Sequence, residues 1–390
     1  MENLEMSDRI DLNDLATELG PKFAEGAAER DESNRFVAEN YVLLKEHKVF
    51  SAQIPMELGG GGVPHSEMCA FVRAIGRHCG PTALTLSMHQ HLVAAAVFNH
   101  SHGKPGQKLL EKVVAGETIL VSTGANDWLA SNGAMERTDG GYLVSAAKPF
   151  ASGSPAGQVM VTSAPYEDPE AGWQVLHFPV PLSAEGVSLA GDWDTMGMRA
   201  TGSQTVRFDK VFVPEEAVAL RRPRDAYHPA YNVILTVALP LIVSAYVGIA
   251  EAAAEIATGM AARRAGDPVA PYLLGVLTNH LTTAQLAADS MVAIANDLAF
   301  DPVTETANAI LVRKTIAASA VMATAEKALE TAGGGGFFRK SGLERLVRDA
   351  HGIQFHPLQE KRQQHFTGRM ALGLDPIELP EEQKLLAAAE

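Results

Sequence analysis

Two residues near the end of the chain have the types that proton transfer requires. His356 lies between Phe355 and Pro357, and Glu360 follows four positions after the histidine. An imidazole can accept or release a proton near neutral pH. A carboxylate can act as a general base when it lies within hydrogen-bond reach of the proton. Each residue also has an ordinary interpretation, His356 as a packing side chain and Glu360 as a solvated charge at the start of a helix.

A run of four glycines is the second feature with chemical meaning, formed by Gly333, Gly334, Gly335 and Gly336. The run follows one segment with helical spacing and precedes another. Without Cβ atoms, its backbone can approach a phosphate closely, and a helix start can bind an anion. A helix C-cap needs only one glycine, so the run is a candidate cofactor contact.

The remaining histidines and the two cysteines give weaker signals. His89 and His91 are two positions apart in an apolar helical segment, so they cannot share one helix face and at most one points into a site. The histidines show no metal-ligand spacing, and we predict no metal centre. Cys69 and Cys79 are too few for a disulfide framework and are expected to be buried thiols, which suits a reducing cytoplasm.

Composition restricts the class of protein. The 390 residues are 46% hydrophobic, which is enough for a substantial core, and the formal charge of −14 is spread along the chain. We find no block of Lys or Arg that could follow a phosphate backbone, so no nucleic acid partner is expected. The first thirty residues lack an apolar core, and Pro240 interrupts the longest apolar run, so we predict neither a signal peptide nor a membrane span. The expected location is the cytoplasm.

The elements that must position these residues change in type along the chain. Residues 1–118 show helical spacing, residues 119–222 contain short β-rich runs separated by Gly, Pro and Asp, and residues 223–378 return to long Ala-rich helical segments. Residues 379–390 read as a polar tail. The sequence therefore predicts an α+β fold with a helical domain, a middle β domain, a second helical domain and a tail.

Four motifs occur in a specific order along this frame. They are Pro55-Met56-Glu57-Leu58-Gly59-Gly60; Lys148-Pro149-Phe150-Ala151-Ser152; Gly197-Met198-Arg199-Ala200-Thr201-Gly202-Ser203 followed by Phe212-Val213-Pro214; and the glycine run with Phe337-Phe338 and Arg348-Asp349-Ala350. Each motif alone is weak. In this order and spacing they resemble the acyl-CoA dehydrogenase superfamily over nearly the whole chain.

The resemblance implies an acyl-CoA dehydrogenase-like fold with an N-terminal helical domain, a middle β-barrel-like domain and a C-terminal four-helix bundle. It also implies a flavin, FAD, between these parts. FMN supplied in reduced form by a partner reductase is the alternative, because the family's second dinucleotide motif is degraded at Arg263-Arg264. In the family the glycine run contacts the flavin of a neighbouring subunit, which implies a homodimer or homotetramer.

Residue by residue, the resemblance implies several flavin contacts. Ser152 corresponds to the hydroxyl beside the reactive ring nitrogen of the flavin, and Phe150 to the aromatic wall. Thr123 and Ser131 are candidate contacts, because residues 122–126 take the place of the family's "TEPxxGSD" loop but lack its Glu and Pro. An ordinary β-turn serine remains the alternative interpretation of Ser152.

The family's catalytic carboxylate is missing from both places where it occurs. Pro357 stands at one of them, and the other falls near Ala238. The nearest acids are Glu251 and Glu360, and Glu360 could serve as a shifted base. Instead, Phe355-His356-Pro357 with Lys361 resembles the oxygen-using branch of the fold, in which a histidine faces the flavin.

Three functions stay open at this stage. The first is a flavin-dependent monooxygenase that acts on a small molecule or a CoA thioester, with His356 and Ser152 as catalytic residues. The second is an acyl-CoA dehydrogenase that uses Glu360 as a relocated base and passes electrons to an electron-transfer flavoprotein. The third is a degenerate, non-catalytic flavin-binding protein.

Overall fold

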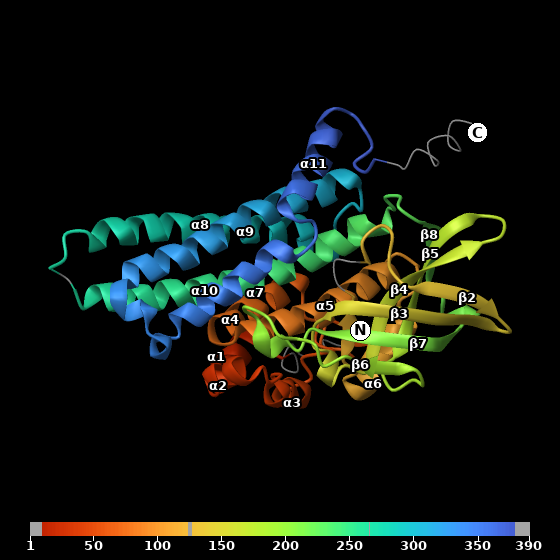
Figure 1. Ribbon diagram of the computed structural model, residues 1–390, viewed down its shortest axis with the longest axis horizontal. Coiled ribbons are helices and arrows are strands. Elements are labelled where there is room, and N and C mark those ends of the chain that lie inside the picture. The colour runs from red at the N-terminus through yellow and green to blue at the C-terminus, as the bar shows by residue number, and fades with distance from the viewer. Residues whose placement is uncertain (1–9, 124–126, 265, 379–390) are drawn as a thin grey trace, which may run out of the picture.

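The computed structural model describes residues 10–123, 127–264 and 266–378. Within these ranges, helices come first, strands follow, and helices return (Figure 1). The strands lie at one end of the long helices α7, α8 and α9, and α5 runs between the helical bundle and the strands. The α+β class and the predicted order of a helical part, a β part and a second helical part are confirmed.

The N-terminal helices form the first layer. Apolar residues at helical spacing place Leu12, Leu15 and Leu19 in the core, and the Asp11 side chain caps the first helix by accepting from the backbone N–H of Asn13 and Asp14. The helices are α1 (Leu12–Ala24), α2 (Ala27–Ser33), α3 (Ala38–Glu46), α4 (His65–His78), α5 (Gly80–Ser101) and α6 (Gln107–Gly116).

The middle of the chain forms two four-stranded sheets. One has the order β1-β4-β5-β8, with β1 parallel to β4, and the other has the antiparallel order β2-β3-β7-β6. Alternating buried residues of the two sheets pack into one core. The strands are β1 (Leu120–Ser122), β2 (Ala134–Thr138), β3 (Gly141–Ala151), β4 (Val159–Asp168), β5 (Gly172–Pro181), β6 (Val187–Leu189), β7 (Gln204–Pro214) and β8 (Leu220–Pro223).

The C-terminal part contains three long helices and two short ones: α7 (Ala230–Ala262), α8 (Ala270–Ala295), α9 (Thr304–Ala332), α10 (Leu343–Ala350) and α11 (Glu360–Ala371). Glycines bring α7 close to α4. A Cβ on Gly76 would lie 2.5 Å from the carbonyl oxygen of Ala245, and one on Gly248 would lie 2.2 Å from that of Arg73. The predicted domain boundaries at residues 118 and 222 stay predictions, and the predicted tail at 379–390 lies outside the described residues.

Helix α7 continues through the proline of the longest apolar run. Pro240 lies inside the helix and does not end it. Packing against α4, α5 and α9 offsets the roughly 3 kcal/mol that an interior proline costs. By length and composition α7 could cross a membrane, but 94% of its most apolar window is buried inside the protein, as in the core helix of a globular fold.

Candidate functional site

A cavity of about 640 Å³ lies between the sheets and the helices. We call it the central cavity. Residues of α5, β4, β5 and α7 line it, together with the loop at 193–198 and the segment at 348–359. Its lining is mostly apolar, with polar side chains at His91, Ser122, Thr123, Asp127, Ser152, Thr162, Ser163, His177, Thr195, Thr201, Ser203, Tyr246, Arg348, His356 and Gln359.

An irregularity in β3 directs two predicted site residues to the cavity. The register with β7 shifts between Lys148 and Ala151, and Phe150 has a φ of +60°. The Phe150 ring is 50% exposed and meets Trp193 edge-on at 5.9 Å. Phe150 and Ser152 both line the central cavity.

A chain of hydroxyl groups determines whether Ser152 donates or accepts a hydrogen bond in the cavity. Thr201 donates to the Met198 carbonyl, so the proton of Ser203 goes to Thr201 Oγ1 at 2.6 Å. Ser152 in turn lies 2.8 Å from Ser203 Oγ and donates to it. Because each hydroxyl has one proton, Ser152 Oγ can only accept a hydrogen bond from a group in the cavity.

Of the two candidate flavin contacts on the preceding loop, only one lies at the cavity. Thr123 lines the central cavity, whereas Ser131 does not. Ser131 instead lies 3.0 Å from Ser163 Oγ and 3.2 Å from the Lys148 ammonium. Residues 124–126, between them in sequence, lie outside the described residues.

Behind Ser131 lies a buried ion pair that the motifs did not reveal. Lys148 Nζ is 2.8 Å from Asp127 Oδ1, and the two side chains are 0% and 8% exposed. Lys148 also donates to the Asn132 carbonyl at 2.8 Å. The pair joins the start of the loop at Asp127 to β3, two residues before Phe150.

His356 lies at the cavity wall, held by two other helices. Its Nε2 is 2.9 Å from the hydroxyl of Tyr246 on α7. Lys314 on α9 donates to the His356 carbonyl at 2.8 Å. Burial, with smaller effects of Lys314 and His91, lowers the pKa of His356 to about 3, so the imidazole is neutral at pH 7.

The two histidines of α5 point in different directions, as a spacing of two residues on a helix requires. His91 lines the central cavity, and its Nδ1 donates to the Ser87 carbonyl. His89 bridges backbone groups, with Nε2 2.8 Å from the Phe50 carbonyl and Nδ1 accepting from the N–H of Leu120 at 2.9 Å. One histidine therefore faces the cavity and the other holds α5 to β1.

No free carboxylate is available in the described lining. Ala238 and Pro357, to which the resemblance assigned the base positions, both line the cavity. Asp127 carries the sole carboxylate of the described lining residues, and it is paired with Lys148. The Glu360 side chain is 54% exposed, bonded to Lys361 and Gln364, and outside the cavity lining.

The glycine run lies away from the central cavity. Residues Gly333–Phe337 form a 3-10 turn at the end of α9, and none of them lines the cavity. Gly333 has a φ of +64°, and a Cβ there would lie 2.6 Å from Arg264 Nη1. Gly334 faces open space. The side chains of Phe337 and Phe338 are 82% and 62% exposed beside the run.

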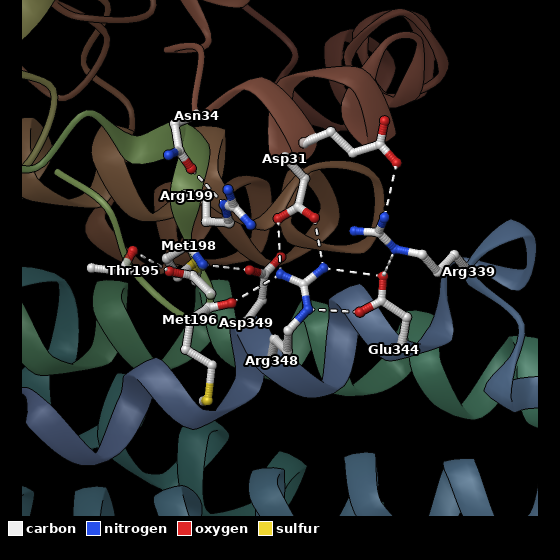
Figure 2. Close-up of polar contacts among 12 residues, drawn as sticks. Asp31, Asn34, Thr195, Met196, Met198, Arg199, Arg339, Glu344, Arg348 and Asp349 are labelled. Atoms are coloured by element: carbon white, nitrogen blue, oxygen red, sulfur yellow. Dashed lines mark hydrogen bonds and ion pairs between the residues drawn. The ribbon is translucent and has the colours of Figure 1, made fainter.

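A polar network ties α10, which precedes the segment with His356 in the chain, to the other layers (Figure 2). Arg348 on α10 pairs with Asp31 of α2 and Glu344 at 2.6 Å each, and donates to the Met196 carbonyl at 2.9 Å. Its neighbour Asp349 accepts from the backbone N–H of Met198. Both residues belong to the "RDA" motif, so this motif positions the cavity wall.

Asp349 gives a testable pH dependence. Burial raises its pKa from 3.8 to about 6, so the folded protein binds this proton more tightly than the unfolded chain. The resulting stabilisation is full below pH 3.8 and is lost as the pH rises through about 6. Asp349→Asn removes this titration but keeps an acceptor for Met198. We expect native stability to fall relative to Asp349→Asn between pH 4 and pH 7.

Urea unfolding of both proteins at several pH values measures this difference. Asp349→Ala is the companion variant, because it leaves the Met198 N–H without its acceptor and should cost about 1–3 kcal/mol at every pH. Parallel stability curves for the native protein and Asp349→Asn would show that the carboxyl group titrates normally.

Two family models match the helical parts that enclose the cavity. The model described as acyl-CoA dehydrogenase, N-terminal domain, matches residues 14–117, and that described as acyl-CoA dehydrogenase, C-terminal domain, matches residues 241–360. The fold and its cavity are thus those of a flavin-dependent oxidoreductase. The chain belongs to the acyl-CoA dehydrogenase superfamily, as its motifs predicted.

Relatives come from both branches of the superfamily. The chain is 28% identical to L-evernosamine nitrososynthase of Micromonospora sp., covering 93% of this chain and 90% of the relative. It is 25% identical to mitochondrial isovaleryl-CoA dehydrogenase of Oryza sativa subsp. japonica, covering 83% and 81%. The structure of KijD3 in complex with FMN and dTDP-3-amino-2,3,6-trideoxy-4-keto-3-methyl-D-glucose superposes with a TM-score of 0.85 at 25% identity, covering 93% of each chain. The protein is a flavoenzyme whose cofactor is FAD or FMN.

Sequence reasoning missed three residues that shape the site. Lys314 lies in an Ala-rich helical segment, where a lysine reads as a surface charge. Tyr246 sits within an apolar run, and Asp127 in a loop without a recognised motif. The motif that contains Lys148 was recognised, but the buried ion pair of its ammonium with Asp127 was not.

Proposed function

We propose that this protein is a flavin-dependent monooxygenase that transfers one oxygen atom from O2 to a small molecule. One observation carries the proposal. Ala238 and Pro357 occupy the two base positions in the cavity wall, and the neutral His356 stands beside Pro357 where a carboxylate would be needed. Without a base to remove the α-proton, desaturation of an acyl-CoA has no starting step.

The cavity residues fit a flavin ring. The half-exposed Phe150 offers an aromatic face, and Ser152 Oγ is an acceptor without another donor in the hydroxyl chain. We assign Phe150, Ser152 and Thr123 to the ring. Ser131 is assigned an indirect role through the Lys148–Asp127 pair. The glycine run, in which Gly334 and Gly335 are exposed, is assigned to the phosphate end of a flavin held by a neighbouring subunit.

The reaction must balance in electrons and protons. A bound reduced flavin supplies the two electrons that reduce O2. One oxygen atom enters the substrate, and the other leaves as water, which requires proton delivery in a cavity with mostly apolar walls. Tyr246 has no other acceptor among the described residues, so its hydroxyl donates to His356 Nε2 and the ring proton lies on Nδ1. His356 therefore offers a neutral N–H donor at the cavity wall.

The relatives suggest which substrates to test first. The Micromonospora relative is named for an amino sugar, and KijD3 was solved with an amino sugar nucleotide. Small amines are therefore the first class, and CoA thioesters the second. We further propose a flavin reductase as the source of reduced flavin, and a homodimer or homotetramer in the cytoplasm.

Isotopically labelled O2 distinguishes the two branches of the superfamily. The protein is mixed with reduced FMN or FAD, labelled O2, and either an amino sugar nucleotide or isovaleryl-CoA. Label in the product, measured by mass spectrometry, supports oxygen transfer. Anaerobic bleaching of the oxidised flavin by isovaleryl-CoA, with an enoyl-CoA as product, would instead support the dehydrogenase.

Glu360→Gln tests the relocated base directly. Because the carboxylate is solvated and outside the cavity lining, we expect the product yield to stay within about twofold of the native value. The measurement is product formed per O2 consumed at fixed reduced flavin. Complete loss of activity in this variant, with its flavin content unchanged, would favour the dehydrogenase with Glu360 as its base.

A further inference from the structure

A buried cation without a counter-ion lies behind His356. Lys314 of α9 is 1% exposed, and its Nζ donates to the carbonyl of His356 at 2.8 Å and to that of Leu358 at 3.1 Å. No carboxylate of the described residues pairs with this ammonium. Burying an unpaired charge is costly, so a neutral side chain would serve the packing better.

The contacts of Lys314 and Tyr246 hold His356 from two sides. Lys314 fixes the backbone carbonyls on either side of Pro357, and Tyr246 fixes the ring at Nε2. Gly352 leaves room for the Tyr246 hydroxyl, because a Cβ there would lie 2.6 Å from it. Both the backbone and the ring orientation of His356 are therefore determined by residues outside its own segment.

The titratable groups around His356 come from four helices. Tyr246 on α7 and His91 on α5 are neutral at pH 7, because burial raises the pKa of Tyr246 and lowers that of His91 to about 4. Asp349 on α10 acts on Tyr246. Burial lowers the pKa of Lys314 to about 8, so it keeps its charge at pH 7. Lys314 is thus the cation that opposes protonation of the imidazole.

We propose that Lys314 is a positioning residue for His356, which fixes the histidine backbone at the cavity wall and whose charge adds to the effect of burial in opposing protonation of the imidazole. The role in oxygen transfer rests on the proposed function, whereas the effect on the imidazole does not. A neutral imidazole keeps one N–H donor and one acceptor, and a protonated one would lose the acceptor that Tyr246 uses.

Two substitutions separate the charge from the hydrogen bonds. Lys314→Gln retains two N–H donors for the two carbonyls but removes the charge, and Lys314→Met removes both. Lys327→Met is the matched control on the same helix, because Lys327 forms an ion pair with the exposed Glu330. Urea unfolding shows whether each variant is folded before the other measurements.

The first readout is the titration of His356 in the full-length protein as purified, followed by NMR of labelled histidine. His356→Gln identifies the signal. We expect the titration midpoint to rise by about one pH unit in Lys314→Gln and in Lys314→Met, and to stay unchanged in Lys327→Met. An unchanged midpoint in folded Lys314→Gln would overturn the inference, whatever reaction the enzyme catalyses.

The second readout is product formed per O2 consumed, measured from pH 7 down through the His356 titration midpoints found in the first readout. We expect the yield of Lys314→Gln to fall at a higher pH than that of the native protein, because its imidazole becomes protonated earlier. Lys314→Met should show the same shift and a lower yield at every pH. A shifted titration with an unshifted yield would uphold the electrostatic role of Lys314 and contradict the proposed use of His356.

Discussion

Replacement of His356 by alanine is expected to lower the yield of oxygenated product by about 100-fold while oxygen consumption continues. The side chain is the neutral N–H donor at the cavity wall, fixed by Tyr246 and by the backbone contacts of Lys314. Without it, proton delivery falls to water, and the oxygen should leave as hydrogen peroxide. Product, oxygen and peroxide measured in the same reaction give the fraction that is uncoupled.

Two further variants make this result specific. His365→Ala removes an exposed histidine of α11 and should leave the yield unchanged. His356→Gln can still hydrogen-bond to Tyr246 but cannot relay a proton between two ring nitrogens. A yield close to native in His356→Gln would reduce the role of His356 to hydrogen bonding. A native yield in His356→Ala would remove the residue from the mechanism.

Replacement of Lys148 by methionine is expected to lower the free energy of unfolding by about 3–5 kcal/mol. Methionine is similar in length to the lysine stem, so the packing changes little. The loss arises because Asp127, 8% exposed in its side chain, is left as a buried charge without its partner. Urea unfolding at pH 7 measures the change. Because Lys148 precedes Phe150 in β3, we also expect weaker flavin binding.

An exposed ion pair supplies the matched control. Lys22 and Glu18 are 2.8 Å apart, with side chains 48% and 53% exposed, so Lys22→Met should cost less than about 1 kcal/mol. The double variant Lys148→Met with Asp127→Asn removes the unpaired charge and should recover part of the lost stability. Equal effects at the buried and exposed pairs would show that the buried pair is solvated in solution.

The elements of the fold followed from local patterns. Helical spacing placed Leu12, Leu15 and Leu19 in the core, and the glycine run ended α9 where expected. Pro240 lies inside α7 although an interior proline is costly, because the packing of α7 against α4, α5 and α9 offsets that cost. The sequence also could not show which segments the "RDA" motif contacts. Its arginine pairs with Asp31 of α2, and its aspartate accepts from the backbone N–H of Met198.

What the sequence determined by itself is the family, the order of helices and strands, and the absence of a carboxylate at Ala238 and Pro357. These are properties of residue type and spacing along one chain. The tertiary structure decided that Glu360 is solvated, that Ser152 can only accept a hydrogen bond from the cavity, and that Lys314 is buried against His356. Each of these depends on side chains from distant segments meeting, because burial and hydrogen-bond partners, rather than residue type, set protonation and polarity.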